Sequence, residues 1–567
     1  KSIMNLSVFC YFYKNNQNQS LAFFLPQITQ IKKIFICHRT IYSPRIHELI
    51  QIKILEFVAK KNIQMRQYFA LSIIGLILVF SSCRTDFDTV ASSGNLKFSK
   101  DTVYLDTVFK NIGSSTYQLK VYNNSKNDIS IPIVQFKKGL DSKYRMTVDG
   151  MTGNNGKIFK DVTLLAKDSL YIFIETTADI TDANPDDFLY TDEIQFDSGA
   201  NLQEVALVTL IQDAVFLYPN QNPDGTKEKI KIDGKDVDGF YLNENDPSNG
   251  NELLFTNEKP YVIYGYAGVP EFKTVTFEAG ARVHFHANSG LYVGDNASLQ
   301  INGTNSTTDK LENEVIFEGD RLESLYSDIP GQWKSVIFSN GSANHTINHL
   351  TLKNAVIGLD LQSPYNTFEI KNTQIYNCAE YGILARDTHV IASNVVINYA
   401  GLASLSCVYG GNYNFTHCTF NNNWSSSSQV AVNLSNSLAG ATPETNPLTN
   451  AIFNNCIIYG SATNEFNLDK NPNAPFVYQL NNCLLKFSSS TKDPNYQFKT
   501  DTEHYSNIIL NENPKFYNVS QNKFNIDKTS AAFAKGDPVF MIPTDILGIT
   551  RTSPPDLGAY QSQDFPK

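Results

Sequence analysis

Basic charge is scarce in most of this chain, and the formal net charge of −10 understates the scarcity. Residues 1–64 hold nine Lys/Arg against two Asp/Glu, and Arg66 is the only charged residue of 65–83, so residues 84–567 carry a net charge of −18. Nucleic acids and anionic lipid surfaces are bound through Lys and Arg side chains that neutralise phosphates. We therefore expect no nucleic-acid partner for this acidic part of the chain.

Cysteine is also scarce, with eight residues in 567. Cys10 and Cys37 lie in the basic first segment and Cys83 ends an apolar run, which leaves five others: Cys378, Cys407, Cys418, Cys456 and Cys483. An odd number without CxxC spacing predicts neither a complete disulfide framework nor a zinc site. His284 and His286 share one face of an expected strand, but no third ligand is evident, so we expect no metal there.

The longest uncharged apolar run, 68–80, follows Met65-Arg66-Gln67 and precedes Ser81-Ser82-Cys83. A secretory signal peptide typically has a short basic start, about a dozen apolar residues, and small residues before the cleavage site. The run is too short for a membrane span. Residues 80–83 (FSSC) resemble a lipobox, although the usual first residue is Leu. That resemblance implies a diacylated Cys83 as the mature N-terminus.

Cys83 also organises the N-terminal segments. We expect 1–64 to be upstream translation ahead of a true start at Met65, 65–83 to be the signal peptide, and 84–94 to be a tether. The lipid would anchor the protein to the outer membrane, on its periplasmic face or at the cell surface.

Short alternating segments separated by turn clusters fill residues 95–215. Their spacing of about ten to twenty residues is typical of an all-β sandwich of immunoglobulin type, here without a Cys pair or Trp. The next segment, 216–254, is rich in Asp, Asn, Gly and Lys in its central part, and we interpret it as a linker or loop.

Residues 255–563 show internal repetition. The first members of matching apolar triplets lie 23, 21, 24, 38 and 27 residues apart: Leu350, Thr373, Asn394, Cys418, Cys456 and Cys483. A period in the low twenties predicts one turn of a parallel β-helix, and the 38-residue interval predicts a loop inserted on one coil. The three aligned cysteines are then buried thiols, and the Asn residues at the turns are structural.

Three stretches carry a family resemblance: 277–303, 331–338 (GQWKSVIF), and 545–551 (DILGITR) with 555–560 (PDLGAY). They resemble bacterial lipoproteins with a right-handed parallel β-helix of pectin-lyase-like shape, and the last is similar to the closing motif of the choice-of-anchor group. The resemblance implies an all-β fold, with an N-terminal sandwich followed by a right-handed parallel β-helix, and an envelope location. It implies no reaction, because a fold does not fix chemistry.

Candidate chemistry is sparse. A polysaccharide lyase needs a base beside a carboxylate, often with calcium, and the best cluster is Arg386, Asp387 and His389. A glycoside hydrolase needs two facing carboxylates, whereas Asp360 and Asp387 occupy different registers. We therefore favour a noncatalytic protein over either enzyme, and a structural spacer is a third hypothesis.

Binding residues are easier to find than catalytic ones. A Ser-, Asn- and Thr-rich insertion, 421–450, contains Trp424, and a neighbouring turn contains Tyr409 and Tyr413. Aromatic rings with amide neighbours suit the apolar faces and hydroxyls of sugars. We expect a polysaccharide or a surface protein as partner, presented by the β-helix, with the membrane reached through Cys83.

Overall fold

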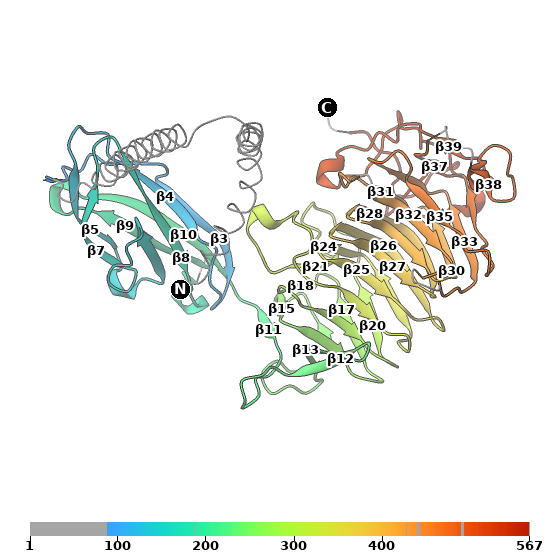
Figure 1. Cartoon of the computed structure of the whole chain (residues 1–567), viewed down its shortest axis with the longest axis horizontal. Coiled ribbons are helices and arrows are strands. Elements are labelled where there is room, and N and C mark those ends of the chain that lie inside the picture. Colours follow the sequence, from blue (N-terminus) through green and yellow to red (C-terminus); the bar gives the residue numbers. More distant parts are fainter. Residues whose placement is uncertain (1–87, 186, 427, 439–442, 489–492, 566–567) are drawn as a thin grey trace, which may run out of the picture. The chain divides into compact units, whose positions relative to one another are not determined.

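The computed structural model describes residues 88–565 except 186, 427, 439–442 and 489–492 (Figure 1). The expected upstream segment, the signal peptide and Cys83 lie outside the described residues. The described chain is all-β, with strands and only short 3-10 helices, which confirms the predicted fold class. None of its helices is long and apolar enough to cross a membrane. The 3-10 helices are Gly139–Asp141, Ile180–Asp182, Gly199–Asn201, Ser324–Tyr326, Pro494–Tyr496, Val519–Gln521 and Pro538–Phe540.

Two sheets form the first part of the described chain. One has the order β1-β5-β9-β10-β3 with β7 paired to β5, and the other has the order β2-β4-β8-β6. Alternate residues of the longer strands point inward, and the two inner faces share one core that includes Leu119, Ile172, Ile131 and Leu207. The strands are β1 Val90–Ala91, β2 Lys97–Phe98, β3 Thr102–Phe109, β4 Tyr117–Tyr122, β5 Ile129–Phe136, β6 Tyr144–Val148, β7 Ile158–Leu164, β8 Ser169–Thr176, β9 Leu189–Phe196 and β10 Gln203–Gln212.

The rest of the chain winds into a parallel β-helix, in which each coil contributes to three stacks of strands. Stack A contains β14 Leu254–Phe255, β17 Thr274–Glu278, β20 Ser298–Asn302, β23 His345–Asn348, the first halves of β26 Thr367–Cys378 and β28 His389–Ala400, then β30 Gly411–Thr416, β33 Leu448–Asn454, β36 Gln479–Asn481 and β38 Tyr505–Ser506.

Stack B follows the same path one corner further along each coil. It contains β11 Val215–Leu217, β15 Tyr261–Ile263, β18 Arg282–Phe285, β21 Val315–Gly319, β24 Leu350–Lys353, the second halves of β26 and β28, then β31 Thr419–Asn422, β34 Ile457–Gly460, β37 Leu484–Leu485 and β39 Ile509–Leu510.

Stack C closes the cross-section. It contains β13 Lys235–Tyr241, β16 Tyr266–Val269, β19 Gly290–Val293, β22 Val336–Phe338, β25 Ile357–Leu361, β27 Tyr381–Arg386, β29 Ala403–Val408, β32 Val430–Ser435 and β35 Phe466–Asp469, and β12 Lys229–Ile232 pairs antiparallel with β13. Inward side chains of the three stacks form one core that runs from Leu217 to Tyr505. Such a solenoid is stabilised by contacts between neighbouring coils.

Two expectations need correction. The segment 216–254 contains strands β12 and β13 and lies largely within the β-helix, because Gly239 to Tyr241 pair with β16 to begin stack C. The alignment of Asn394 with Thr373 and Cys418 is off by one residue, since Val395 lies between Thr373 and Cys418 in the ladder. Asn394 instead occupies the corner just before it, where its φ of 51° suits Asn better than a β-branched residue.

The cysteine prediction is confirmed for stack B. Cys418, Cys456 and Cys483 occupy one position on successive coils, as the pairing of the residues after them shows, and all are fully buried free thiols. The long coil between Cys418 and Cys456 contains the predicted excursion, but it is narrower than 421–450 because β32 pairs regularly with β29 inside that range.

The segment after β39 does not add a coil. Its apolar residues pack against outward-facing residues of stack B, and one resulting cluster joins Tyr376 and Val396 to Phe524, Ile546 and Tyr560. The backbone N–H of Gly558 donates to the carbonyl of Asn455 over 2.8 Å. The motif at 545–560 therefore covers a side wall of the β-helix.

Candidate functional site

Two pockets lie at opposite ends of β28. The first, which we call the amide pocket, has a volume of about 490 Å³ and is lined by Asp328, Asn377, Asn398, Tyr399, Asn423, Val519, Ser520 and Asn522. The second, the His389 pocket, has a volume of about 330 Å³ and is lined by Pro364, Asp387, Thr388, His389, Gly411, Asn412, Asn446, Pro447 and Thr449.

Coil corners place the amides and the aromatic ring of the amide pocket. Asn377 and Tyr399 occupy equivalent positions on successive coils, with φ of 56° and 61°. Asn398 Nδ2 donates to Asn522 Oδ1 over 2.7 Å, and Asn398 Oδ1 accepts from Asn421 Nδ2 over 2.8 Å. The pocket amides are thus held in place by one another before any ligand arrives.

An aromatic pair stands beside these amides. The rings of Tyr399 and Trp424 have centroids 4.8 Å apart and an interplanar angle of 49°. Both side chains are half-buried, so each keeps part of its surface open to solvent. Trp424 is fixed through its backbone N–H, which donates to Asn422 Oδ1 over 3.1 Å. Tyr399 lines the pocket, and Trp424 packs against the Tyr399 ring without being a lining residue itself.

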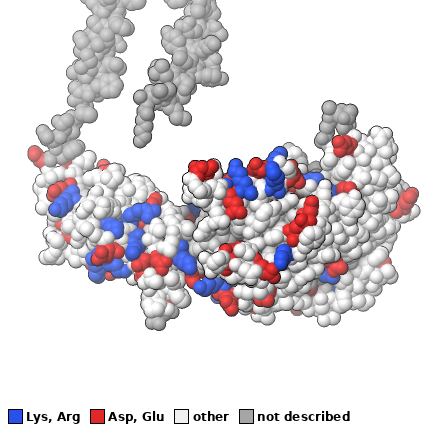
Figure 2. Space-filling view, turned by 90° about the horizontal axis from the view of Figure 1, so that it is seen from below, with Lys and Arg blue, Asp and Glu red and all other residues white. Residues whose placement is uncertain are grey.

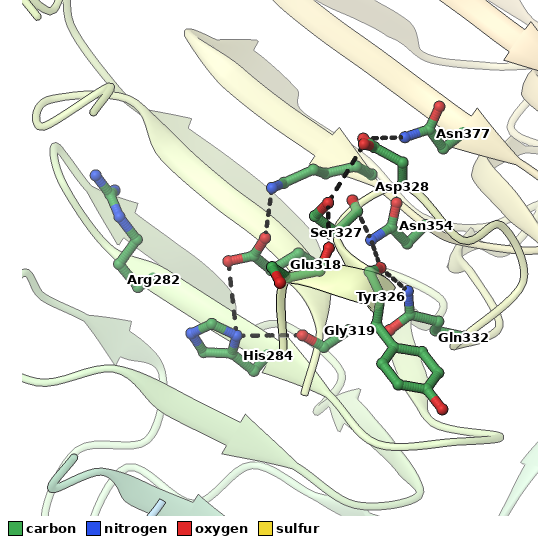
Figure 3. Close-up of polar contacts among 12 residues, drawn as sticks. Arg282, His284, Glu318, Gly319, Tyr326, Ser327, Asp328, Gln332, Asn354 and Asn377 are labelled. Atoms are coloured by element: carbon green, nitrogen blue, oxygen red, sulfur yellow. Dashed lines mark hydrogen bonds and ion pairs between the residues drawn. The ribbon is translucent and has the colours of Figure 1, made fainter. Parts of the chain in front are cut away.

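The loop between β21 and β22 brings Asp328 to the pocket (Figure 3). Gln332 Nε2 donates to the Tyr326 carbonyl over 2.6 Å, and Asn354 Nδ2 donates to the Ser327 carbonyl over 3.0 Å. Asn377 Nδ2 then donates to Asp328 Oδ1 over 3.2 Å. Amide side chains that satisfy loop carbonyls thus hold the carboxylate where the pocket opens.

A charged cluster supports the start of that loop (Figure 3). Lys353 Nζ lies 2.7 Å from Glu318 Oε2, and His284 Nδ1 lies 3.7 Å from Glu318 Oε1. Burial alone would raise the pKa of Glu318, but His284, Lys353 and Arg282 together lower it. Burial lowers the pKa of His284. The cluster is mutually satisfied and faces no pocket named above.

The two histidines considered for a metal have separate partners. His286 Nδ1 lies 2.7 Å from Asp320 Oδ2, whereas His284 Nδ1 faces the Gly319 carbonyl at 3.3 Å. Within the described ranges, no group of three or more His, Cys, Asp or Glu residues is placed to hold a metal ion.

The His389 pocket gathers two of the three predicted catalytic residues. Asp387 accepts a hydrogen bond from Asn446 Nδ2 over 2.6 Å, and His389 Nδ1 lies 3.1 Å from Thr367 Oγ1. Arg386 is not among the lining residues, because its guanidinium binds Asp360 through two contacts of 2.7 and 3.2 Å. The predicted base and carboxylate therefore do not meet in one site.

The three aromatic residues predicted to bind a ligand, Tyr409, Tyr413 and Trp424, do not lie in one site either. Tyr413 is fully buried, and its hydroxyl donates to the Gly410 carbonyl over 2.8 Å, so its ring is closed to a ligand and this prediction needs correction. Tyr409 is half-buried at a corner with φ of 56°. Trp424 packs against Tyr399, which lines the amide pocket. The sequence pattern did not single out Tyr399. A one-residue shift of the repeat alignment would have matched Tyr399 with Asn377.

Charge is dispersed over the surface in the face that Figure 2 draws, where Lys and Arg alternate with Asp and Glu and large areas carry neither. Such a surface gives no continuous field to attract a highly charged polymer.

Comparisons with known proteins give no family. No family model matches the chain, and no curated protein matches it. Among solved structures, the E. coli chaperone DraB is 14% identical at a TM-score of 0.15, covering 22% of this chain and 58% of its own. The periplasmic chaperone SfaE is 14% identical at a TM-score of 0.14, and the match covers 21% of this chain and 58% of SfaE. The PapD-like domain 7 of human CEP192 is 9% identical at a TM-score of 0.13, and the match covers 23% of this chain and 96% of that domain. The chain thus spans little more than half of the two chaperones, and scores this low support no assignment.

Proposed function

We propose that this protein is a noncatalytic envelope lipoprotein, anchored through a lipidated Cys83, whose β-helix binds a glycan at the amide pocket. The observation that carries the proposal is the Tyr399–Trp424 pair beside a pocket lined by four Asn side chains. Aromatic rings cover the apolar faces of sugars, and amides donate to and accept from their hydroxyls.

The arrangement of carboxylates favours binding over cleavage. Hydrolysis of a glycosidic bond uses two carboxyl groups that flank the bond. Asp328 is the one acidic residue that lines the amide pocket, and Asp387 is the one that lines the His389 pocket. Arg386, the predicted lyase base, is committed to Asp360. Neither pocket has the pair that a hydrolase needs.

Glycan retention tests the binding proposal. The full chain, purified in detergent, is passed over immobilised neutral and acidic polysaccharides, and retention and new unsaturated ends are both followed. We expect retention without cleavage and a roughly two- to tenfold loss of affinity for Trp424→Ala, because an aromatic stacking contact contributes about 0.5–1.5 kcal/mol. Tyr104→Ala, which removes a 65% exposed ring on β3, is the matched control. Equal losses in the two variants, or retention by neither polysaccharide class, would refute the proposal.

Acylation tests the anchor. Cells fed a labelled fatty acid should label the wild-type protein and place it in the outer-membrane fraction, on its periplasmic face or at the cell surface. Cys83→Ser should abolish labelling and release the protein from membranes. Ser82→Ala, which keeps a small residue before the Cys, should leave labelling intact. Persistent membrane anchoring of the Cys83→Ser variant would contradict the proposed role of this residue.

A further inference from the structure

The amide pocket has an unbalanced charge. Asp328 is the only charged residue among its eight lining residues. Its carboxylate is held by neutral donors, Asn377 Nδ2 at 3.2 Å and Ser327 Oγ at 3.3 Å. No ion pair of Asp328 occurs within the part of the chain that the structure describes.

The lysines that neighbour the pocket in sequence are already paired. Lys523 follows Asn522, and its Nζ lies 3.1 Å from Asp309 Oδ2. Lys353 precedes Asn354 of the loop support, and its Nζ lies 2.7 Å from Glu318 Oε2. Neither residue lines the pocket. A cation supplied by a ligand would therefore meet a carboxylate with no competing cation beside it.

The aromatic pair has the same preference. The face of a Tyr or Trp ring carries negative electrostatic potential and attracts a cation positioned over it. A ligand carboxylate would instead meet the like charge of Asp328 and the ring of Tyr399, against which Trp424 packs, with no Lys or Arg among the lining residues to offset them. The charge and the aromatic wall thus both favour a cationic group and disfavour an acidic one.

We infer that the amide pocket selects glycans that carry a free amino group, over their acetylated counterparts and over uronic acid polymers. This inference rests on the proposed glycan binding and adds the class of sugar. Asp328 is the specificity-determining residue, since it alone contributes a formal charge. Asn398, Asn423 and the aromatic pair bind the sugar ring and its hydroxyls. The volume of about 490 Å³ is in the range of small-ligand sites.

Calorimetric titration of the full chain tests the inference with four probes. They are chitosan oligomers, the same oligomers fully N-acetylated, oligogalacturonate of equal length, and spermidine as an amine without a sugar ring. The pH is kept low enough to protonate the amines. We expect chitosan oligomers to bind at least tenfold more tightly than the acetylated oligomers, and oligogalacturonate and spermidine to bind more weakly than both. Added salt should reduce the preference, because it screens exposed charges.

Matched variants assign the preference to Asp328. Asp328→Asn should reduce the ratio of the chitosan affinity to the acetylated-oligomer affinity to about one, with an unchanged melting temperature as the check on folding. Glu512→Gln removes an exposed carboxylate outside the pocket lining, and should leave the ratio unchanged. An Asp328→Asn ratio equal to that of the wild type overturns the inference.

The remaining outcomes distinguish the preference for amino sugars from the proposed glycan binding on which it rests. Binding of acetylated and free-amine oligomers with equal affinity, both sensitive to Trp424→Ala, overturns the amino-sugar preference and leaves glycan binding standing. Spermidine binding as tight as chitosan binding overturns the role of the sugar ring. Binding of no glycan at all overturns both.

Discussion

Arg551 donates a hydrogen bond from Nη2 to Asn394 Oδ1 over 2.8 Å, although the two residues are 157 positions apart. The same nitrogen donates to the carbonyls of Gly558 and Ala559 at 3.1 and 3.2 Å. Arg551 is only 5% exposed, and burial lowers its pKa to about 10. One guanidinium therefore joins a coil corner to the terminal segment that covers the side wall.

Removal of Arg551 should weaken that covering. Arg551→Met keeps the stem but leaves three buried acceptors without their donor, so we expect a loss of about 2–4 kcal/mol in the free energy of unfolding. Urea unfolding measures the loss, and limited proteolysis should cut earlier within 513–563. Arg321→Met, at a side chain that is 42% exposed, is the control and should cost less than about 1 kcal/mol. Equal costs in the two variants would contradict this role.

The stability of the β-helix should fall as pH rises, because of Glu465. This carboxyl is fully buried, and its Oε2 has no hydrogen-bond partner within the described residues. Burial raises its pKa from the ordinary 4.5 to about 8, against the lowering effects of the Ala462 and Ala431 backbone and of Lys486. The folded state thus keeps a proton that the unfolded state releases near pH 4.5.

The sign of the pH effect follows from that raised pKa. The contribution of Glu465 to stability is complete below about pH 4.5 and is lost as pH rises to about 8, by on the order of 5 kcal/mol over the window. Glu465→Gln should flatten the pH dependence of urea unfolding, whereas Glu512→Gln, at an exposed carboxyl, should not. An unchanged slope in Glu465→Gln would show that another group titrates.

The Arg386–Asp360 pair should be structural. Asp360 is 7% exposed, and burial raises its pKa against the lowering effect of Arg386. Arg386→Ala leaves a buried carboxylate without its cation, so we expect a loss of about 3–5 kcal/mol near neutral pH. The double variant Arg386→Met with Asp360→Leu should recover most of it. A stable Arg386→Ala protein would instead leave Arg386 available for chemistry, the reverse of the expected result.

The five described cysteines should be inert in the folded protein. All are buried free thiols, and burial raises the pKa of Cys378 to about 12. A thiol reacts through its thiolate, so iodoacetamide should label none of the five at neutral pH and all of them in urea, as followed by peptide mass spectrometry. Reducing agent should leave the melting temperature unchanged. Rapid native labelling of Cys418, Cys456 or Cys483 would mean that the coils open readily.

Local sequence patterns were enough to predict the strands and the repeat of the β-helix. Alternating apolar residues and left-handed Asn corners are local properties, and they place Cys418, Cys456 and Cys483 on one ladder before any contact is known. The one-residue error at Asn394 has a local cause as well. Asn394 occupies a corner and not a ladder position, so the match of Asn394 with Thr373 shifted the alignment of that one coil by one residue.

Which side chains meet depends on how the coils pack in three dimensions. Asp328 comes from the loop between β21 and β22, Asn377 and Tyr399 from the corners of successive coils, and Asn522 from the terminal segment that folds back on the side wall. Their convergence depends on coil stacking and on that return, which no local pattern encodes. Arg386 is a second example of a contact that the local pattern does not encode. Its neighbours in sequence suggested a catalytic cluster, but its guanidinium binds Asp360 on the preceding coil. Local alternation thus sets the scaffold, and the long-range packing of coils sets the site.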